Sequence, residues 1–216
     1  MATYKRLDNL ERIAKAYSSG KYASVDRVVI IWQDNTTSPP DWLLPLEKQP
    51  IPVHVRRSKV NSMNERFRLD PRIRTEAVFM VDDDLNIQSS DLELAFQTWK
   101  ALGKDQRIVG FTARDYQLSD DRMTYMPFVA KSYSMILSNA AFLHRSFFEY
   151  YWSDDIRPYR EYVDEGQSSL CAIHQPDFAA QSIQLRRSPY QLSRLKPYST
   201  TSASLPTCSP CPQLSR

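Results

Sequence analysis

Residues 78–84 read Val-Phe-Met-Val-Asp-Asp-Asp, and this stretch decides the predicted fold. Four consecutive apolar residues, rich in β-branched and aromatic types, predict a strand buried on both faces, as in a parallel sheet. Because side chains alternate along an extended chain, we expect Asp82 and Asp84 on one side and Asp83 on the other. Ligands of open α/β sheets bind beyond the carboxyl ends of the strands, where this triplet lies.

The acidic triplet also predicts a chemistry. Three adjacent carboxylates repel one another unless a cation or hydrogen-bond donors compensate their charge. Mg²⁺ and Mn²⁺ prefer oxygen ligands, and a metal held by one or two carboxylates usually completes its coordination with substrate phosphates. The triplet therefore predicts a metal–diphosphate site. A structure that turned these carboxylates away from any cleft, or paired them with neighbouring lysines and arginines, would contradict this hypothesis.

The alternative for an acidic run after a strand is a solvated turn or a helix cap. Here Ser89 and Ser90 are predicted to cap the next helix, with Glu93 completing a capping box. The helix then does not need the aspartates, which favours a functional role for them.

Strand-like and helix-like segments alternate around this stretch. Apolar periodicity predicts helices at 7–17 and 91–102, a helix-capable polar segment at 61–68, and strands at 25–32, 51–55, 74–81 and 107–111. Residues 131–142 are expected to form a strand and then the start of a helix. This alternation predicts an α/β layer architecture.

Composition sets further limits. The 216 residues are 42% hydrophobic, enough for one substantial core. Only four glycines occur, with no Gly-rich phosphate-binding motif, so a cation is expected to hold any phosphate. The net charge of +3 comes from the last segment, and nucleic acid is therefore not expected as a partner. No apolar run reaches the roughly 18 residues of a membrane-spanning helix and no signal peptide follows Met1, so the chain as written is expected to be soluble.

The character of the sequence changes after Gln167. The remaining residues carry six of the fourteen prolines, many serines and no sustained periodicity. They also hold all three cysteines (Cys171, Cys208 and Cys211), without a second pair to complete a zinc site. We therefore expect a folded domain over 1–167 and a divergent, basic, disordered tail over 168–216.

Several separate motifs, in order along the chain, resemble one known family. They are Thr-Tyr-Lys-Arg at 3–6, Val-Val-Ile-Ile-Trp at 28–32, Asn-Ser-Met-Asn-Glu-Arg-Phe at 61–67, Thr-Glu-Ala-Val-Phe-Met-Val-Asp-Asp-Asp at 75–84, Arg-Ile-Val-Gly-Phe at 107–111, Tyr-Ser-Met-Ile-Leu at 133–137 and Tyr-Val-Asp-Glu at 162–165. Together they resemble the C-terminal glycosyltransferase domain of the exostosin and exostosin-like family, whose members build heparan sulfate and related glycans.

The resemblance implies an α/β, GT-A-like fold with a mixed, mainly parallel sheet flanked by helices. It further implies Mn²⁺ (or Mg²⁺), a donor that is UDP-N-acetylglucosamine or UDP-N-acetylgalactosamine, and transfer of the sugar to a glycan acceptor with retention of anomeric configuration. Members of the family are membrane-anchored in the lumen of the Golgi or the endoplasmic reticulum, and homo-oligomers or hetero-oligomers with a paralogue are compatible with the resemblance.

Site roles follow by position from the same resemblance. Arg6 matches an arginine that contacts the nucleotide, and Asn61 and Arg66 match the asparagine and arginine of the donor pocket. Asp82 and Asp83 match residues at the nucleoside and the sugar, and Asp84 matches the main metal ligand. The residue types fit these roles, because a planar guanidinium suits phosphate and an amide can both donate and accept.

Three departures from the family pattern limit the expected activity. Gln33 follows the strand-end tryptophan where the family has asparagine, which makes this substrate-binding side chain one methylene longer. The chain begins at Met1 where the family has its first strand, and no Asn-Cys-acid-Asp signature follows Gln167. We therefore expect a domain truncated at both ends that retains the donor- and metal-binding half. Its catalytic residue is unassigned and sugar transfer is expected to be inefficient.

Two other hypotheses remain at this point. The first is a non-catalytic fragment that binds the donor or a partner. The second is a haloacid-dehalogenase-like phosphatase with Asp82 as nucleophile and Asp84 as acid/base. Asn86 stands where that phosphatase motif has Thr or Val, which argues against it.

Overall fold

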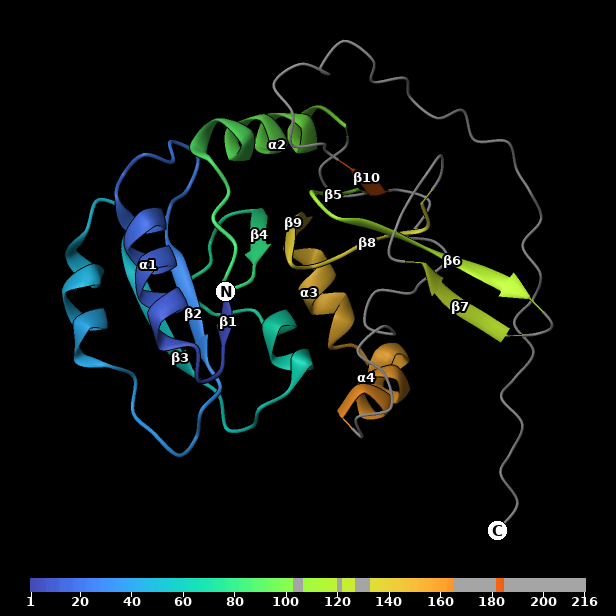
Figure 1. Ribbon diagram of the computed structural model, residues 1–216, viewed down its shortest axis with the longest axis horizontal. Coiled ribbons are helices and arrows are strands. Elements are labelled where there is room, and N and C mark those ends of the chain that lie inside the picture. The colour runs from blue at the N-terminus through green and yellow to red at the C-terminus, as the bar shows by residue number, and fades with distance from the viewer. Residues whose placement is uncertain (103–106, 120–121, 127–132, 165–181, 185–216) are drawn as a thin grey trace.

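The structure, a computed structural model, describes residues 1–102, 107–119, 122–126, 133–164 and 182–184. Its α-helices are α1 (Leu7–Ser18), α2 (Ser89–Ala101), α3 (Ser146–Tyr151) and α4 (Arg157–Asp164), and its 3₁₀ helices are η1 (Asp41–Lys48), η2 (Met63–Phe67) and η3 (Asp154–Ile156). The strands are β1 (Ala2–Thr3), β2 (Val28–Trp32), β3 (Val53–Arg57), β4 (Ala77–Val81), β5 (Ile108–Gly110), β6 (Ala113–Ser119), β7 (Arg122–Met126), β8 (Met135–Ile136), β9 (Ala140–His144) and β10 (Ser182–Gln184). The mixed α/β class predicted from the sequence is confirmed (Figure 1).

Two sheets lie edge to edge. Strands β1, β2 and β3 pair in parallel, and the second sheet has the order β10-β5-β9-β4. A parallel bridge between Ala2 in β1 and Asp82, one residue past β4, joins them. Among the described strands of these two sheets, only β9 runs antiparallel to its neighbours, β4 and β5. The result is a mixed, mainly parallel sheet.

The sheet has two buried faces because its side chains alternate. On one face, Val81, Val109 and Phe142 pack with residues of α1 and α2, such as Ile13 and Trp99. The opposite face holds a second core cluster that includes residues of η2 and α3. Its sheet residues are the immediate neighbours of those on the first face: Met80, Ile108, Ala141 and Leu143.

Most predicted elements form close to their expected positions. The helix predicted at 7–17 is α1, which buries Leu10, Ile13, Ala14 and Tyr17 as the periodicity requires. The helix predicted at 91–102 is α2, and the polar segment 61–68 contains the short η2. Strands β2, β3 and β4 begin two or three residues later than predicted, and β5 falls inside 107–111.

The predicted capping box at the start of α2 is absent. Gln88 is the N-cap residue and makes no side-chain cap hydrogen bond, and Ser89 and Ser90 lie inside the helix. Glu93 does not reach back to the helix start, because it accepts hydrogen bonds from the amide and hydroxyl of Ser24. The aspartates do not cap the helix either, since Asp84 precedes the N-cap residue by four positions.

The prediction of a strand and a helix start within 131–142 is also wrong in part. The described residues there form β8, a turn at Ser138 and Asn139, and the beginning of β9, while α3 starts only at Ser146. β9 alternates between the two faces of the sheet, which a helical segment could not do. The antiparallel hairpin of β6 and β7 was not predicted from the sequence.

The neighbours of β4 differ from those predicted. Its full length pairs antiparallel with β9, and it meets a parallel neighbour only at the bridge beyond Val81. Met80 and Val81 are buried, but Ala77, Val78 and Phe79 are half-buried. These three residues line a cavity of about 530 Å³ between β2 and β4, which also involves Phe96 and Trp99 of α2. Burial on both faces therefore holds only at the carboxyl end of the strand.

Of the predicted tail, 168–216, only Ser182–Gln184 is described. These three residues form β10, which pairs parallel with β5, although no strand was predicted there. The prediction of disorder for the rest, and the three cysteines, lie outside the described residues. No helix in the described part of the chain has the length and apolar character needed to cross a membrane.

Candidate functional site

Four strands bring their carboxyl ends to one edge of the sheet (Figure 1). The Gln33 amide donates to the Thr3 carbonyl at 3.1 Å, just past β2, and the Ser58 amide donates to the Trp32 carbonyl at 2.8 Å, just past β3. Asp82 follows β4 at the same edge. Parallel strands place their carboxyl ends together, so residues far apart in the sequence meet here.

The acidic triplet does not continue the extended geometry of β4. The strand ends at Val81, and the Leu85 amide donates to the Asp82 carbonyl at 3.3 Å, so that Asp83 and Asp84 lie in a turn. The predicted alternation, with Asp82 and Asp84 on one side, is therefore wrong. The three carboxylates divide differently between two arginines.

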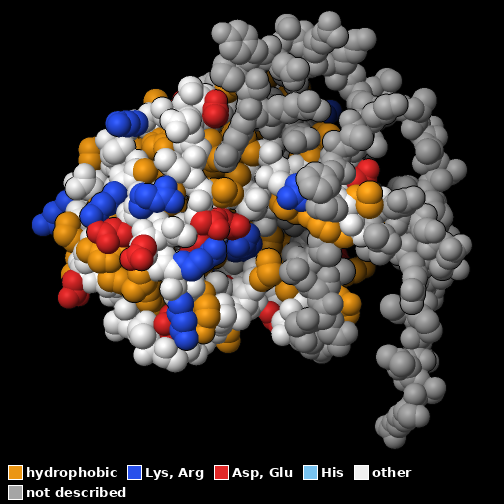
Figure 2. Space-filling view, viewed as in Figure 1, with side chains coloured by type: hydrophobic (Ala, Val, Ile, Leu, Met, Phe, Trp, Pro, Cys, Tyr) orange, Lys and Arg blue, Asp and Glu red, His pale blue; other side chains and the backbone are white. Residues whose placement is uncertain are grey.

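Arg6 contacts two of the aspartates. Its Nη2 lies 2.7 Å from Asp83 Oδ1, and its Nη1 donates to Asp84 Oδ2 at 2.9 Å. The Asp83 side chain has no exposed surface, whereas the Asp84 side chain is 43% exposed. On the face seen in Figure 2, acidic and basic side chains lie side by side near the middle of the described part of the molecule. Asp84 is therefore the solvent-facing one of the two aspartates that Arg6 contacts, and it is also the residue predicted to hold a metal.

Arg66 contacts the remaining aspartate. Its Nη2 donates to Asp82 Oδ1 at 2.9 Å, and its Nη1 donates to the Ser138 hydroxyl at 3.1 Å. The Arg66 side chain is 16% exposed, and its buried Nε has no hydrogen-bond partner among the described residues. These two hydrogen bonds fix the orientation of the guanidinium, while its Nε–H stays unpaired among the described residues.

Burial raises the pKa of the Asp83 carboxyl above its ordinary value. The neighbouring Thr3 hydroxyl and the Arg6 guanidinium lower this pKa, while the charges of Asp84 and Asp82 raise it further. The acidic residues thus repel one another as the sequence predicts. The arginines provide the compensating charge in this structure.

An unusual backbone conformation places Arg6 over the acids. Lys5 has a φ of +59°, in the left-handed region that side-chain-bearing residues rarely adopt. It forms the turn between β1 and α1, and Arg6 follows as the N-cap residue of α1. Strained backbone of this kind persists where the surrounding contacts determine it, and here those contacts are the two ion pairs of Arg6.

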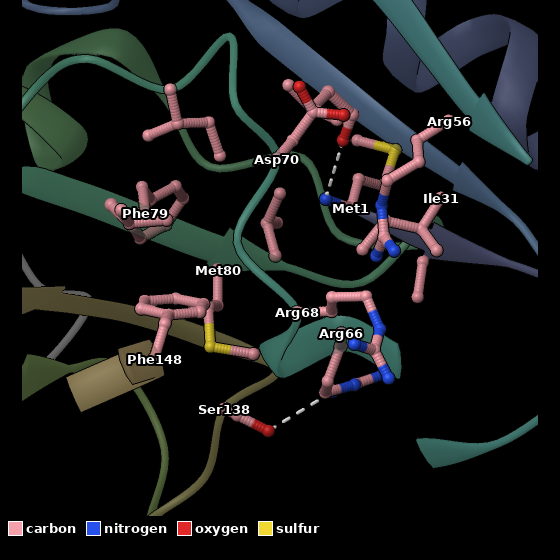
Figure 3. A pocket seen from close by; sticks show the side chains of 15 residues that line it. Met1, Ile31, Arg56, Arg66, Arg68, Asp70, Phe79, Met80, Ser138 and Phe148 are labelled. Atoms are coloured by element: carbon pink, nitrogen blue, oxygen red, sulfur yellow. Dashed lines mark hydrogen bonds between the residues drawn. The ribbon is translucent and has the colours of Figure 1, made fainter. Parts of the chain in front are cut away.

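Behind the Arg66 guanidinium lies a small cavity of about 40 Å³. Figure 3 shows the guanidinium groups of Arg56 and Arg66 on one side of it and the apolar Met80 and Phe148 on the other. Arg56 Nε is also buried without a partner among the described residues. This edge of the sheet therefore concentrates guanidinium groups.

Gln33 and Asn61 lie near each other but outside the charged cluster. Gln33 is 7% exposed, and its side-chain amide donates to the carbonyl of Ser62, the neighbour of Asn61. Asn61 itself is exposed. The Gln33 amide thus holds the loop that carries Asn61.

Sequence reasoning missed Ser138 and Asn139. Ser138 anchors Arg66, and the Asn139 carbonyl accepts a hydrogen bond from the Asp82 amide at 2.9 Å. Asn139 Oδ1 is buried without a partner among the described residues. A polar pair between two apolar segments, at the edge where strands end, is the signal that could have identified them.

The ion pairs bear directly on the metal hypothesis. All three aspartates pair with arginines, and such pairing argues against a bound cation because the arginines already compensate the negative charge. However, these arginines are Arg6 and Arg66, the two predicted for the same site. Among the described residues, no group of three or more His, Cys, Asp or Glu side chains is arranged to hold a metal. The exposed carboxylate of Asp84 suits a hard cation that takes its other ligands from phosphate and water, provided that Arg6 releases Oδ2.

Comparison with known proteins identifies the relatives of this chain. The glycosyl transferase family 64 domain matches residues 1–171, four residues beyond the predicted domain boundary. Glucosamine inositolphosphorylceramide transferase 1 of Arabidopsis thaliana is 41% identical over 165 residues, which are 74% of this chain and 20% of that protein. Human exostosin-like 2 is 31% identical over 159 residues, 69% of this chain and 47% of that protein. The exostosin-like-3 homologue of Caenorhabditis elegans is 34% identical over 140 residues, 65% of this chain and 17% of that protein.

The chain therefore spans about a fifth of the plant relative and about half of exostosin-like 2. The predicted resemblance to exostosin-like glycosyltransferases is confirmed, and it sets aside the phosphatase alternative. This chain belongs to the glycosyl transferase family 64 domain family.

Proposed function

We propose that this domain binds a UDP-N-acetylhexosamine at the carboxyl-end edge of β1, β2 and β4, and that it serves transfer of the sugar to a glycan acceptor with retention. The mainly parallel sheet with its acidic strand end supports assigning the fold as GT-A-like. The observation that carries the proposal is the cluster of two guanidinium groups and three carboxylates at this edge.

Each residue type suits a part of this donor. Arg66 carries a planar guanidinium that Asp82 and Ser138 hold in place, and guanidinium groups bind phosphate oxygens through their remaining N–H donors. The carboxylates of Asp82 and Asp83 can accept hydrogen bonds from ribose and sugar hydroxyls. The amide of exposed Asn61 lies at the rim, where it can meet the base or the ribose, and the buried Gln33 amide holds the loop that carries it.

Asp84 is the proposed ligand of Mn²⁺ or Mg²⁺. Its carboxylate is the most exposed of the paired acids, and oxygen is the ligand atom that these cations prefer. When bound, the cation would stabilise the negative charge of the diphosphate leaving group. Arg6, once released from Asp84, is then free to contact the nucleotide while it still faces buried Asp83.

The proposed reaction breaks the bond between the anomeric carbon and the diphosphate oxygen, and UDP departs with the electron pair. The oxygen of an acceptor hydroxyl bonds to the same face of that carbon, and its proton passes to a base. No residue is assigned to that base. We therefore propose donor binding as the property of this chain that can be measured, with transfer near background.

Isothermal titration calorimetry with UDP and Mn²⁺ tests the site. Binding is expected, and Asp84→Ala should remove its dependence on Mn²⁺, because the cation then has no protein ligand. Asp155→Ala removes an exposed aspartate in η3 and serves as the matched control, with binding unchanged. Equal Mn²⁺-dependent binding by wild type and Asp84→Ala would refute the metal assignment.

A transfer assay separates an enzyme from a non-catalytic donor-binding fragment. UDP-N-acetylglucosamine and UDP-N-acetylgalactosamine are offered with two acceptors, a heparan-type oligosaccharide and an inositolphosphorylceramide, the lipid in the plant relative's name. UDP affinity without turnover supports the fragment. Robust turnover would show that this chain carries a working catalytic group.

A further inference from the structure

The short helix η2 sends three consecutive side chains in three directions. A 3₁₀ helix has three residues per turn, so Asn64, Glu65 and Arg66 diverge, while Asn64 and Phe67 lie on the same side. Glu65 turns toward β3, where its carboxylate and carbonyl accept from Arg56 at 3.1 and 2.7 Å. The third direction carries the Arg66 guanidinium to Asp82.

Asn64 faces the opposite part of the fold. It is 1% exposed, and its Nδ2 donates to the Arg160 carbonyl in α4 at 2.9 Å. Its Oδ1 accepts a hydrogen bond from the Tyr151 hydroxyl, at the end of α3. A buried amide with both functions satisfied fixes position well, because any displacement leaves a buried polar group unpaired.

Tyr151 holds η2 at two points. Its hydroxyl binds Asn64, and its ring stacks on Phe67 with centroids 4.3 Å apart. Both contacts are on the same side of η2, as the three-residue repeat requires. Burial raises the pKa of Tyr151 to about 12, so its hydroxyl stays a proton donor throughout the physiological range.

A further set of contacts ties the start of η2 to α4. The Ser62 hydroxyl caps η2 by accepting from the Asn64 amide at 3.0 Å, and it donates to the Asp164 carboxylate. The Arg160 guanidinium donates to the carbonyls of Tyr151 and Ser153, which locks the helices α3 and α4 together. Among the described contacts of η2, Asn64 and Ser62 face α3 and α4, and Arg66 is the side chain directed at the charged edge of the sheet.

We infer that Asn64 and Tyr151 are positioning residues that set the orientation of the Arg66 guanidinium for the donor diphosphate. The inference deepens the proposed function and rests on it for the affinity readout. It assigns to two residues outside the charged cluster a role in donor binding that is distinct from holding the fold together.

The test compares Tyr151→Phe with Tyr159→Phe. The first removes one hydroxyl and keeps the ring on Phe67, and the second makes the same change at an exposed tyrosine of α4. Two quantities are measured at 25 °C: the Arg66 Nε–Hε nuclear magnetic resonance signal of the free protein, identified by its loss in Arg66→Lys, and the UDP affinity.

In Tyr151→Phe the Arg66 signal should shift and broaden, and UDP affinity should fall about 3- to 10-fold, the effect of one hydrogen bond. Arg66→Lys should then cost less affinity in the Tyr151→Phe background than in wild type. Tyr159→Phe should change neither quantity. If Tyr151→Phe lowers the melting temperature but leaves the Arg66 signal and UDP affinity unchanged, Tyr151 is structural only and the inference is wrong.

Two provisions keep the test decisive. If wild type does not bind UDP, the proposed function fails, while the Arg66 signal still decides the positioning role. If Tyr151→Phe does not fold, Asn64→Leu is used instead, since it removes both hydrogen bonds of the buried amide and keeps a similar side-chain volume. An unchanged Arg66 signal in that variant overturns the inference.

Discussion

The two ends of strands β2 and β4 differ sharply. At the carboxyl end, β1 lies between them, with Ala2 opposite both Ile31 and Asp82, and two arginines pair with the three aspartates. Toward the amino end the same two strands border a cavity of about 530 Å³ lined by Phe96 and Trp99. The strands thus meet a polar, charge-paired edge where β1, only two residues long, lies between them, and an apolar cavity where no strand does among the described residues.

The largest expected effect distinguishes the packing at these two ends. Phe67→Ala, in the core beside η2, should lower the free energy of unfolding by about 3–5 kcal/mol, because the ring is 4% exposed and its removal leaves a large cavity. Phe96→Ala, at the existing cavity, should cost less than half as much, since that ring is only half-buried. Urea unfolding measures both. Equal losses would mean that the two regions are packed alike.

The next effect concerns charge. Arg66→Ala should weaken UDP binding about 10- to 100-fold, the value of a charge-assisted hydrogen bond to phosphate. Arg27→Ala, at the mouth of the large cavity, is the matched control and should leave UDP binding unchanged. Calorimetry in the presence of Mn²⁺ checks both variants. A comparable loss of affinity in Arg27→Ala would show that the nucleotide binds near the large cavity, which would contradict the proposed site at the carboxyl ends of the strands.

A smaller effect is expected at the turn that brings Arg6 to the acids. Because Lys5 has a left-handed φ of +59°, Lys5→Gly should be more stable than Lys5→Val by at least about 1–2 kcal/mol. The same pair of substitutions at Lys21, which is exposed and lacks a positive φ, should not favour glycine in this way. Thermal or urea unfolding gives the differences. No preference for glycine at position 5 would contradict the described turn.

The smallest effect should be a gain. Ala77→Val adds two methyl groups to β4 where it borders the large cavity, and filling that space should raise stability by about 0.5–1 kcal/mol. The same change at Ala141, which is 1% exposed and paired with Met80, should instead destabilise by about 1–3 kcal/mol through overpacking. Differential scanning calorimetry can resolve the opposite signs.

Much of the fold could be predicted because its signals are local. The apolar face of α1 and the apolar run of β4 are periodic patterns, and both elements form within three residues of their predicted ends. The predictions failed where contacts between residues far apart in the sequence determine the local structure. Glu93, expected to complete a capping box at the start of α2, instead accepts a hydrogen bond from Ser24, 69 residues earlier in the chain.

By itself, the sequence determined that an apolar strand ends in three aspartates, that helices and strands alternate, and that the motifs are those of glycosyl transferase family 64. Only the tertiary structure decided which arginine meets which aspartate. Arg6 and Asp84 are 78 positions apart, and Asn64 and Tyr151 are 87 apart. Such pairings depend on how β1 and η2 are placed against the sheet, and no local pattern of residues encodes that placement.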